Sequence, residues 1–270
     1  MEDIYLKLGK LRSFLQQKGR VAVAFSGGVD STFLLKVAHE VLGNNVLAIT
    51  ARSGLFPVRE MEESRAFTSE NKIQHIICDI DELKIDGFIK NPPDRCYLCK
   101  KTLFRTFLKV ASDHGFIYLS EGSNTDDAGD YRPGMKAIKE LGVLSPLKES
   151  GFSKEEIRQL SREMGLPTWE KPSFACLASR FPYGEPITRE KLNTIEKAEK
   201  FLFDLGFQQI RVRYHGNLAR IEVAPGEMDQ LMVPEMRRII DEGIKKTGFT
   251  YVSVDLQGYR TGSMNESLNV

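Results

Sequence analysis

The sequence has no apolar run close to the roughly 20 residues that a helix needs to span a bilayer, so we expect no membrane partner. It also has no large excess of one charge. The formal net charge of +1 at pH 7 argues against nucleic acid as a general polyanionic partner, although it is compatible with a local basic patch. The N-terminal segment is amphipathic and carries acids, so it is not a signal peptide, and a cytoplasmic location follows as the default.

Cysteine is scarce, and in a reducing compartment its four residues are not expected to form structural disulfides. We interpret them as core residues, reactive thiols or metal ligands. The remaining composition is ordinary for a globular protein. With 41% hydrophobic and 28% charged residues, a chain of 270 residues has enough material for one large domain or two modest ones.

Apolar runs alternate with amphipathic stretches in the first part of the chain, which indicates a parallel sheet covered by helices on both faces, an α/β fold. The expected strands are residues 21–25, 46–50, 73–79 and 116–120. Helices are expected at 4–17, up to about 42, from about 57, and after the N-cap Ser153, where Glu156 completes a capping box.

The chain after about residue 186 has its own pattern and predicts a small α+β module. Its expected elements are a helix from the cap Thr188 to about 205, strands at 209–214 and 219–223 joined by a hairpin, a helix at about 227–246 and a strand at 251–256. We therefore expect three parts: a nucleotide-binding domain at 1–170, a cysteine-bearing loop at 171–185, and a substrate-binding and oligomerisation domain at 186–270 that forms a homo-oligomer.

The stretch VAVAFSGGVDSTF predicts a strand, a turn rich in glycine and hydroxyl groups, and the start of a helix. Free backbone N–H groups and the positive end of the helix dipole then point at one place, which suits a phosphate. Glycine leaves room for that phosphate. The turn has no lysine, so it is not a Walker A loop. Its residues are Ser26, Gly27, Gly28, Val29, Asp30, Ser31 and Thr32.

The pattern SGGVDS resembles the PP-loop of the ATP pyrophosphatases, which cleave ATP to AMP and pyrophosphate and adenylate a substrate oxygen. The resemblance implies that the turn binds ATP and that Asp30 helps to hold the Mg²⁺ that bridges the phosphates. The alternative is a glycine-rich turn without a ligand.

Ligands of parallel sheets bind at the carboxyl ends of the strands. This rule gathers polar residues around the same crevice as the turn, namely Thr50, Arg52, Asp79 and Glu121. The segment after the fourth strand resembles one that PP-loop enzymes use to contact the nucleotide. That resemblance implies ATP contacts for Gly122, Asn124 and Asp126, whereas the segment by itself also fits a plain loop.

Of the cysteines, Cys78 lies in a predicted buried strand and is expected to be a core residue. Cys96 and Cys99 form a CxxC pair, and Cys176 stands alone in the inter-domain loop. A thioredoxin-like role is not expected, because the pair does not follow the right strand at the start of a helix. A tetrahedral zinc site needs four ligands, and only one more exposed cysteine is present. Three cysteines suit a 4Fe–4S cluster with one open iron, and unrelated exposed thiols are the alternative.

Four motifs together resemble the LarE family of ATP-dependent sulfur transferases, over nearly the whole chain. They are SGGVDST, NPPDRCYLCK, KPSFACLASRFPYGEPIT and RVRYHGNLARIEV. That family builds the nickel-pincer cofactor of lactate racemase from pyridinium-3,5-biscarboxylic acid mononucleotide. The resemblance implies that ATP adenylates each carboxylate in turn and that a sulfur nucleophile displaces AMP to give a thiocarboxylate.

The resemblance leaves two sulfur donors open. In one branch of the family a single cysteine, matching Cys176, gives up its own sulfur and becomes dehydroalanine. This sequence adds Cys96 and Cys99 and so resembles the branch in which three cysteines hold a 4Fe–4S cluster with a replaceable sulfide. Cys176 would then be a cluster ligand, and the source of the sulfide is not given by the sequence.

Arg211 and Arg213 alternate with an apolar residue on a predicted strand, so both guanidinium groups lie on one face and suit a phosphate and a carboxylate. An exposed polar strand face is the alternative. The resemblance also implies acids near that site, at Glu199 and Glu222. Arg180, beside Ser179, is expected to steady adenylate or carboxylate charge, and both are assigned to the site.

Three rival functions fit parts of the pattern. An amide-forming PP-loop synthetase needs no cysteine trio and usually needs a glutaminase, which is not encoded here. A tRNA-thiolating enzyme would need an RNA-binding module and a basic face, which a net charge of +1 does not favour. A nucleotide-binding module without activity would retain the turn but would not need Cys176 together with the CxxC pair.

Overall fold

The computed structural model describes residues 3–128, 133–172 and 175–268, and Ser173 and Phe174 of the predicted cysteine loop lie outside them. The chain divides into two units. The first consists of Met1–Asp81 and Cys96–Phe174, and the second consists of Glu82–Arg95 and Ala175–Val270. The segment Glu82–Arg95 thus leaves the first unit and joins residues that are distant in sequence.

The first unit contains a four-stranded parallel sheet in the order β3-β2-β1-β4. Its strands are β1 (Val21–Ala24), β2 (Val46–Arg52), β3 (Gln74–Asp79) and β4 (Tyr118–Ser120). Its helices are α1 (Ile4–Lys18), α2 (Val29–Leu42), α3 (Val58–Glu70), α4 (Arg95–Asp113), α5 (Gly134–Glu140), α6 (Pro146–Glu149) and α7 (Lys154–Glu163). The predicted α/β fold and its four strands are confirmed.

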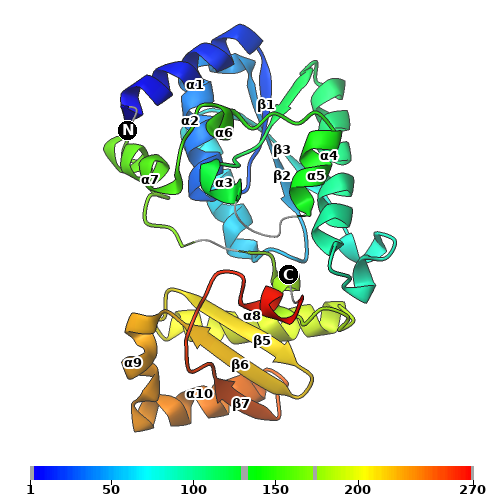
Figure 1. Cartoon of the computed structure of the whole chain (residues 1–270), viewed down its shortest axis with the longest axis vertical. Helices are drawn as coiled ribbons and strands as arrows, with labels where there is room; N and C mark the ends of the chain where they lie inside the picture. The colour runs from blue at the N-terminus through cyan, green and yellow to red at the C-terminus, as the bar shows by residue number, and fades with distance from the viewer. Residues whose placement is uncertain (1–2, 129–132, 173–174, 269–270) are drawn as a thin grey trace. The chain divides into compact units, whose positions relative to one another are not determined.

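Side chains alternate across β1 and bury both faces of the sheet. Val21 and Val23 pack with side chains of α1, α2 and α7, whereas Ala22 packs with side chains of α4 and α5. Figure 1 shows α1, α2 and α7 on one side of the sheet and α4 and α5 on the other. The carboxyl ends of the strands are therefore left for the loops that form the candidate site.

The second unit contains a three-stranded sheet in the order β5-β6-β7, and Figure 1 shows α8 and α10 beside it. Its elements are α8 (Arg189–Asp204), β5 (Ile210–His215), β6 (Leu218–Val223), α9 (Met228–Met232), α10 (Pro234–Lys246) and β7 (Tyr251–Val254). The β5–β6 pair is antiparallel and the β6–β7 pair is parallel. The predicted cap Thr188 accepts the Lys191 N–H at 3.3 Å.

Three details of the predicted elements are wrong. The helix expected at about 227–246 is two helices, because Val233 is extended before Pro234, which opens α10. The last strand ends at Val254 rather than at 256. Cys96 and Cys99 do stand at the start of a helix, α4, although two 3₁₀ turns separate that helix from β3.

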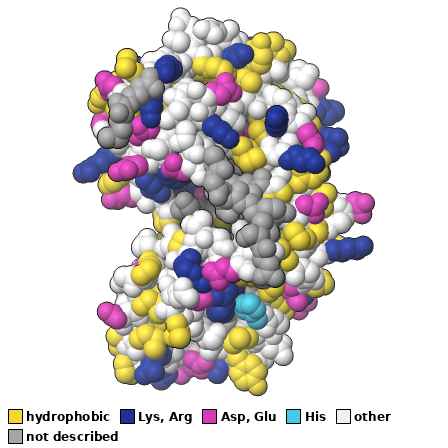
Figure 2. Space-filling view, in the orientation of Figure 1, with side chains coloured by type: hydrophobic (Ala, Val, Ile, Leu, Met, Phe, Trp, Pro, Cys, Tyr) yellow, Lys and Arg dark blue, Asp and Glu magenta, His cyan; other side chains and the backbone are white. Residues whose placement is uncertain are grey.

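No helix among the described residues is long and apolar enough to span a bilayer. Figure 2 shows basic and acidic side chains interspersed on the face in view. This distribution agrees with the net charge of +1.

Candidate functional site

The predicted phosphate-binding turn joins β1 to α2 and is stabilised by its own serines. The Ser31 hydroxyl donates to the Gly28 carbonyl at 3.2 Å and accepts the Ser26 backbone N–H at 3.3 Å. Gly28 is the N-cap of α2 and offers no capping side chain. The N–H groups of Val29, Asp30 and Ser31 therefore have no acceptor within the helix, and such groups can bind an anion.

Gly27 is required by both conformation and space. Its φ is 73°, in the left-handed region that favours glycine. A Cβ at this position would collide with Ser64 Oγ of α3 and would lie 3.3 Å from the Glu60 carbonyl oxygen. Helix α3 consequently lies directly against the turn.

The Asp30 carboxylate is contacted by side chains from two other elements. Lys154, the first residue of α7, forms an ion pair with Oδ2, and Asn124 Nδ2 donates to Oδ1 at 3.3 Å. Gly122 permits this approach, because a Cβ there would lie 3.2 Å from Asp30 Cβ. The structure thus brings together Asp30, Gly122 and Asn124, three of the residues predicted to bind ATP and Mg²⁺.

The segment after β4 is ordered by its acids. Glu121 is buried and accepts the Ser123 N–H at 3.1 Å, the Ser123 hydroxyl at 2.7 Å and the Ser145 hydroxyl at 2.6 Å. The Asp126 N–H donates to Asn124 Oδ1 at 2.9 Å, and Asp126 Oδ2 accepts the first N–H of α7 at 2.8 Å. Glu121 therefore shapes the segment, while Asp126 connects it to α7.

Thr50 lies beneath the turn in a series of buried and half-buried hydrogen bonds. Its hydroxyl donates to the Phe25 carbonyl at 2.6 Å and lies 2.8 Å from His75 Nε2, and His75 Nδ1 lies 2.9 Å from Thr68 Oγ1. Burial lowers the pKa of His75 to about 4, so the ring is neutral at pH 7. These hydrogen bonds connect Phe25, the residue after β1, with β2, β3 and α3 directly behind the turn.

Arg52 and Asp79 are opposite each other at the carboxyl ends of β2 and β3. The Arg52 guanidinium donates to both carboxylate oxygens, at 2.5 and 2.7 Å, and these hydrogen bonds hold the pKa of Asp79 below its usual value. The two side chains are 51% and 72% exposed, so solvent screens the pair and a ligand could displace either member.

Two lysines at the turn were not predicted from the sequence. Lys154 pairs with Asp30, and Lys171 Nζ lies 3.1 Å from the Gly27 carbonyl oxygen. A signal for Lys154 was present: it directly follows the cap Ser153, and a cation at a helix N-terminus is unfavourable unless an acid lies nearby. Lys171 carried no comparable signal, because its partners come from distant elements.

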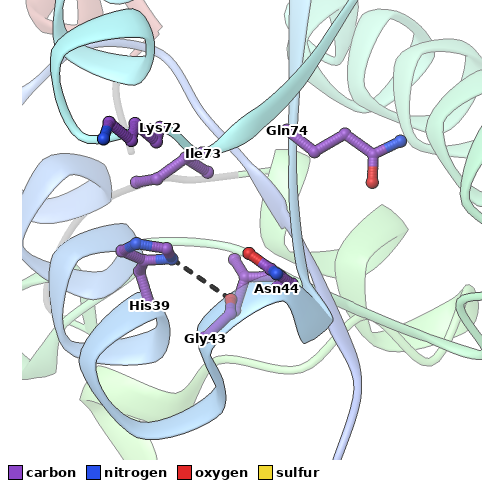
Figure 3. Close-up of a pocket in the computed structure, with 7 residues that line it drawn as sticks. His39, Gly43, Asn44, Lys72, Ile73 and Gln74 are labelled. Atoms are coloured by element: carbon purple, nitrogen blue, oxygen red, sulfur yellow. Dashed lines mark hydrogen bonds between the residues drawn. The ribbon is translucent and has the colours of Figure 1, made fainter.

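A surface pocket of about 300 Å³ lies at the other edge of the sheet, where β2 and β3 begin (Figure 3). It is lined by His39, Gly43, Asn44, Val46, Lys72, Ile73 and Gln74. None of the predicted site residues lines it. Since ligands of parallel sheets bind at the carboxyl ends, the candidate site remains the turn rather than this pocket.

In the second unit, Arg180 is 1% exposed and forms a bidentate pair with Glu199 of α8, at 2.7 and 2.9 Å. Its Nη1 donates to the carbonyls of Ala175 and Cys176, at 2.9 and 3.3 Å, and to the Ser179 hydroxyl at 2.8 Å. Arg180 thus fixes the backbone around Cys176.

The two predicted substrate arginines on β5 are also buried. Arg213 donates to Glu222 Oε2 at 2.6 Å, to the Ser263 hydroxyl at 3.0 Å and to the Ser179 carbonyl at 3.0 Å. Arg211 donates to the Ile210 carbonyl at 2.6 Å and is 2% exposed. Burial, and then the nearby Arg180 charge, lower the pKa of Arg211 to about 10.

Cys78 lies in the core, as predicted, and burial raises the pKa of its thiol. Cys96 and Cys99 are half-buried in the first turn of α4, where i and i+3 side chains share a face, and belong to the first unit. Cys176 is half-buried and belongs to the second unit. Among the described residues, no three His, Cys, Asp or Glu side chains form a group that could hold a metal ion.

The family of the chain follows from its similarity to individual proteins, since no family model matches it. It is 44% identical over 262 residues to an uncharacterized protein of Synechocystis, covering 97% of this chain and 98% of that protein. It is 30% identical over 194 residues to one component of the glutamine-hydrolyzing GMP synthase of Thermoplasma volcanium, covering 66% of this chain and 61% of that component.

A third relative covers the whole length and has an activity in its name. Pyridinium-3,5-bisthiocarboxylic acid mononucleotide synthase of Lactiplantibacillus plantarum is 37% identical over 269 residues, covering 99% of this chain and 97% of the synthase. A similarity of this extent spans both units, with the turn in the first and the arginines of β5 in the second. By that near full-length identity, the chain belongs to the family of this synthase, the LarE family of PP-loop enzymes.

Proposed function

We propose that the protein is an ATP-dependent sulfur transferase that converts the carboxylates of pyridinium-3,5-biscarboxylic acid mononucleotide to thiocarboxylates, for biosynthesis of the nickel-pincer cofactor used by lactate racemase. The observation that carries the proposal is the full-length similarity to the L. plantarum synthase. Two features of the structure suit the reaction: an anion-binding turn in the first unit and a set of buried arginines in the second.

The first step is adenylation. A substrate carboxylate oxygen forms a bond to the α-phosphorus of ATP, and the bond from that phosphorus to the pyrophosphate oxygen breaks. The N–H groups at the start of α2 would bind the phosphates, and Lys154 lies where it can neutralise charge beside Asp30. The carboxylate of Asp30 is a ligand of the type that Mg²⁺ prefers, and Mg²⁺ would supply charge neutralisation on the leaving pyrophosphate.

The second step is sulfur transfer. A sulfur nucleophile attacks the acyl carbon and the bond to AMP breaks, which leaves a thiocarboxylate; the cycle is then repeated on the other carboxylate. Arg211 and Arg213 would bind the substrate phosphate and carboxylate, with Glu222 and Ser179 fixing Arg213. Arg180 would hold the chain around Cys176, through the carbonyl contacts described above.

The sulfur donor has two candidate forms. Thiolates are the ligands that iron–sulfur clusters prefer, and Cys96, Cys99 and Cys176 would hold a 4Fe–4S cluster that supplies a replaceable sulfide. In the other form, the Cys176 thiolate attacks the acyl carbon to give a thioester. Loss of the Cα proton then breaks the Cβ–S bond, leaving a thiocarboxylate and dehydroalanine.

The test uses protein purified without oxygen and supplied with ATP, Mg²⁺ and the mononucleotide. We expect AMP, pyrophosphate and a product heavier by the exchange of oxygen for sulfur, detected by mass spectrometry. Brown protein with about four irons per chain, several turnovers with added sulfide, and loss of activity in each of Cys96→Ala, Cys99→Ala and Cys176→Ala would support the cluster. Cys78→Ala is the matched control and should retain activity.

Other outcomes separate the alternatives. Colourless active protein that makes at most one sulfur transfer per chain, with the Cys176 peptide lighter by one H₂S, would identify Cys176 as the donor. An amide formed from ammonium in place of a thiocarboxylate would show an amide synthetase. Absence of any adenylation of the mononucleotide would refute the proposed function.

A further inference from the structure

Lys171 lies against the phosphate-binding turn from outside it. Its Nζ lies 3.1 Å from the Gly27 carbonyl oxygen, 2.7 Å from Glu60 Oε2 and 2.5 Å from Glu63 Oε2. The Lys171 side chain is 11% exposed and that of Glu60 is 9% exposed. The Lys171 ammonium and the Glu60 carboxylate need each other, because removal of either would leave the other as an unpaired charge with little access to water.

The backbone of Lys171 is fixed as well. Arg158 of α7 donates to the carbonyls of Trp169 and Lys171, the latter at 2.7 Å. The Arg162 guanidinium lies over the Trp169 ring, 4.8 Å from its centroid. The position of Nζ is thus set from both ends, by α7 through the backbone and by α3 through the two carboxylates.

The contact with Gly27 sets the direction of a peptide group. The peptide between Gly27 and Gly28 is trans, so the Gly27 carbonyl and the Gly28 N–H point in opposite directions. Lys171 holds the carbonyl on the α3 side, and the Gly28 N–H is directed to the opposite side, where it donates to Ser26 Oγ at 3.4 Å. Gly27 has a φ of 73° and no side chain, so the residue itself does little to hinder rotation of this peptide.

From this geometry we propose that Lys171 is a positioning residue for the phosphate-binding turn. It orients the Gly27–Gly28 peptide, with the Gly28 N–H on Ser26, and so fixes the start of α2, where the N–H groups of Val29, Asp30 and Ser31 face the β- and γ-phosphates of ATP. The inference rests on the proposed use of ATP by this site. Lys171 would affect binding of the pyrophosphate part of ATP and would have no part in sulfur transfer.

The test compares ligands that contain the pyrophosphate group with one that lacks it. Affinities of the full-length protein for Mg²⁺–ATP, Mg²⁺–pyrophosphate and AMP are measured by calorimetry for the parent and for Lys171→Met. Loss of a charge-assisted hydrogen bond predicts affinities for ATP and pyrophosphate about tenfold weaker, with that for AMP unchanged. Lys171→Arg should restore most of the lost affinity, since it retains charge and donors.

Lys109→Met, at a solvent-exposed ion pair on α4, is the matched control and should bind all three ligands as the parent does. If Lys171→Met does not fold by circular dichroism, the shorter Lys171→Gln is measured in its place. Parent-like pyrophosphate affinity in a folded neutral variant, or equal losses for ATP, pyrophosphate and AMP, would overturn the positioning role. Failure of the parent itself to bind ATP would instead refute the proposed function.

Discussion

The buried pair between Glu199 and Arg180 makes the sharpest prediction about the second unit. Glu199 accepts two hydrogen bonds from Arg180 and also the Val212 backbone N–H of β5, at 2.9 Å. Glu199→Ala removes the acceptors of all three bonds at once. Arg180, at 1% exposure, would then be a buried cation without its carboxylate.

The expected cost follows from that burial. Removing one member of a buried ion pair costs about 3–5 kcal/mol, because the remaining charge stays away from water. The matched control is Asp204→Ala on the same helix; Asp204 and its partner Lys200 are 55% and 72% exposed. An exposed pair of this kind contributes about 0.3–0.5 kcal/mol.

The two units can be followed separately in urea. The one tryptophan of the sequence, Trp169, lies in the first unit, whereas circular dichroism reports on both units. Glu199→Ala should lower the urea midpoint of the second unit by about 1 M or more, since urea changes stability by about 1–3 kcal/mol per M. In this variant the circular dichroism signal should therefore begin to change at a lower urea concentration than Trp169 fluorescence does. A midpoint within the range of Asp204→Ala would refute our account of the pair.

Other predictions concern both units. Asp30→Ala should abolish pyrophosphate release but leave the circular dichroism spectrum unchanged; release at the parent rate would exclude Asp30 from the site. Arg211→Ala and Arg213→Ala should each weaken mononucleotide binding about tenfold or more and leave ATP binding unchanged. Equal losses of affinity for ATP and for the mononucleotide would show that these arginines do not form the substrate pocket. Folding lowers the pKa of His75 to about 4, so the contribution of the neutral ring to the free energy of unfolding is complete above pH 6.5 and is lost as the pH falls toward 4. In His75→Gln the urea midpoint should fall less steeply over that pH range.

The sequence predicts the centre of the sheet well because β1 and β2 are largely apolar runs that are buried between layers of helices. Val21–Ala24 and Val46–Arg52 were predicted to within one or two residues. The error at Pro234 has a local cause that could have been used, since proline favours the first position of a helix and restricts the residue before it. The start of α4 was missed because the CxxC pair was interpreted as a ligand motif and not as a first helical turn.

The partners of charged side chains were harder to predict. The hairpin register places Arg211 opposite Glu222, and it could be derived from the turn. The observed pair is diagonal, from Arg213 to Glu222. A neighbour two residues along is still within reach of a long side chain, and the choice depends on Ser179 and Ser263, which other segments bring to the same place.

The electrostatics around β5 link this geometry to the proposed function. The carboxylates of Glu199 and Glu222 pair with Arg180 and Arg213. Burial and then the Arg180 charge lower the pKa of Arg211 to about 10, so the surroundings of this guanidinium disfavour its charged form. A bound anion would favour the charged form and raise that pKa. A substrate phosphate or carboxylate is such an anion, so the burial that penalises Arg211 in the unliganded protein strengthens its attraction for the substrate in the complex.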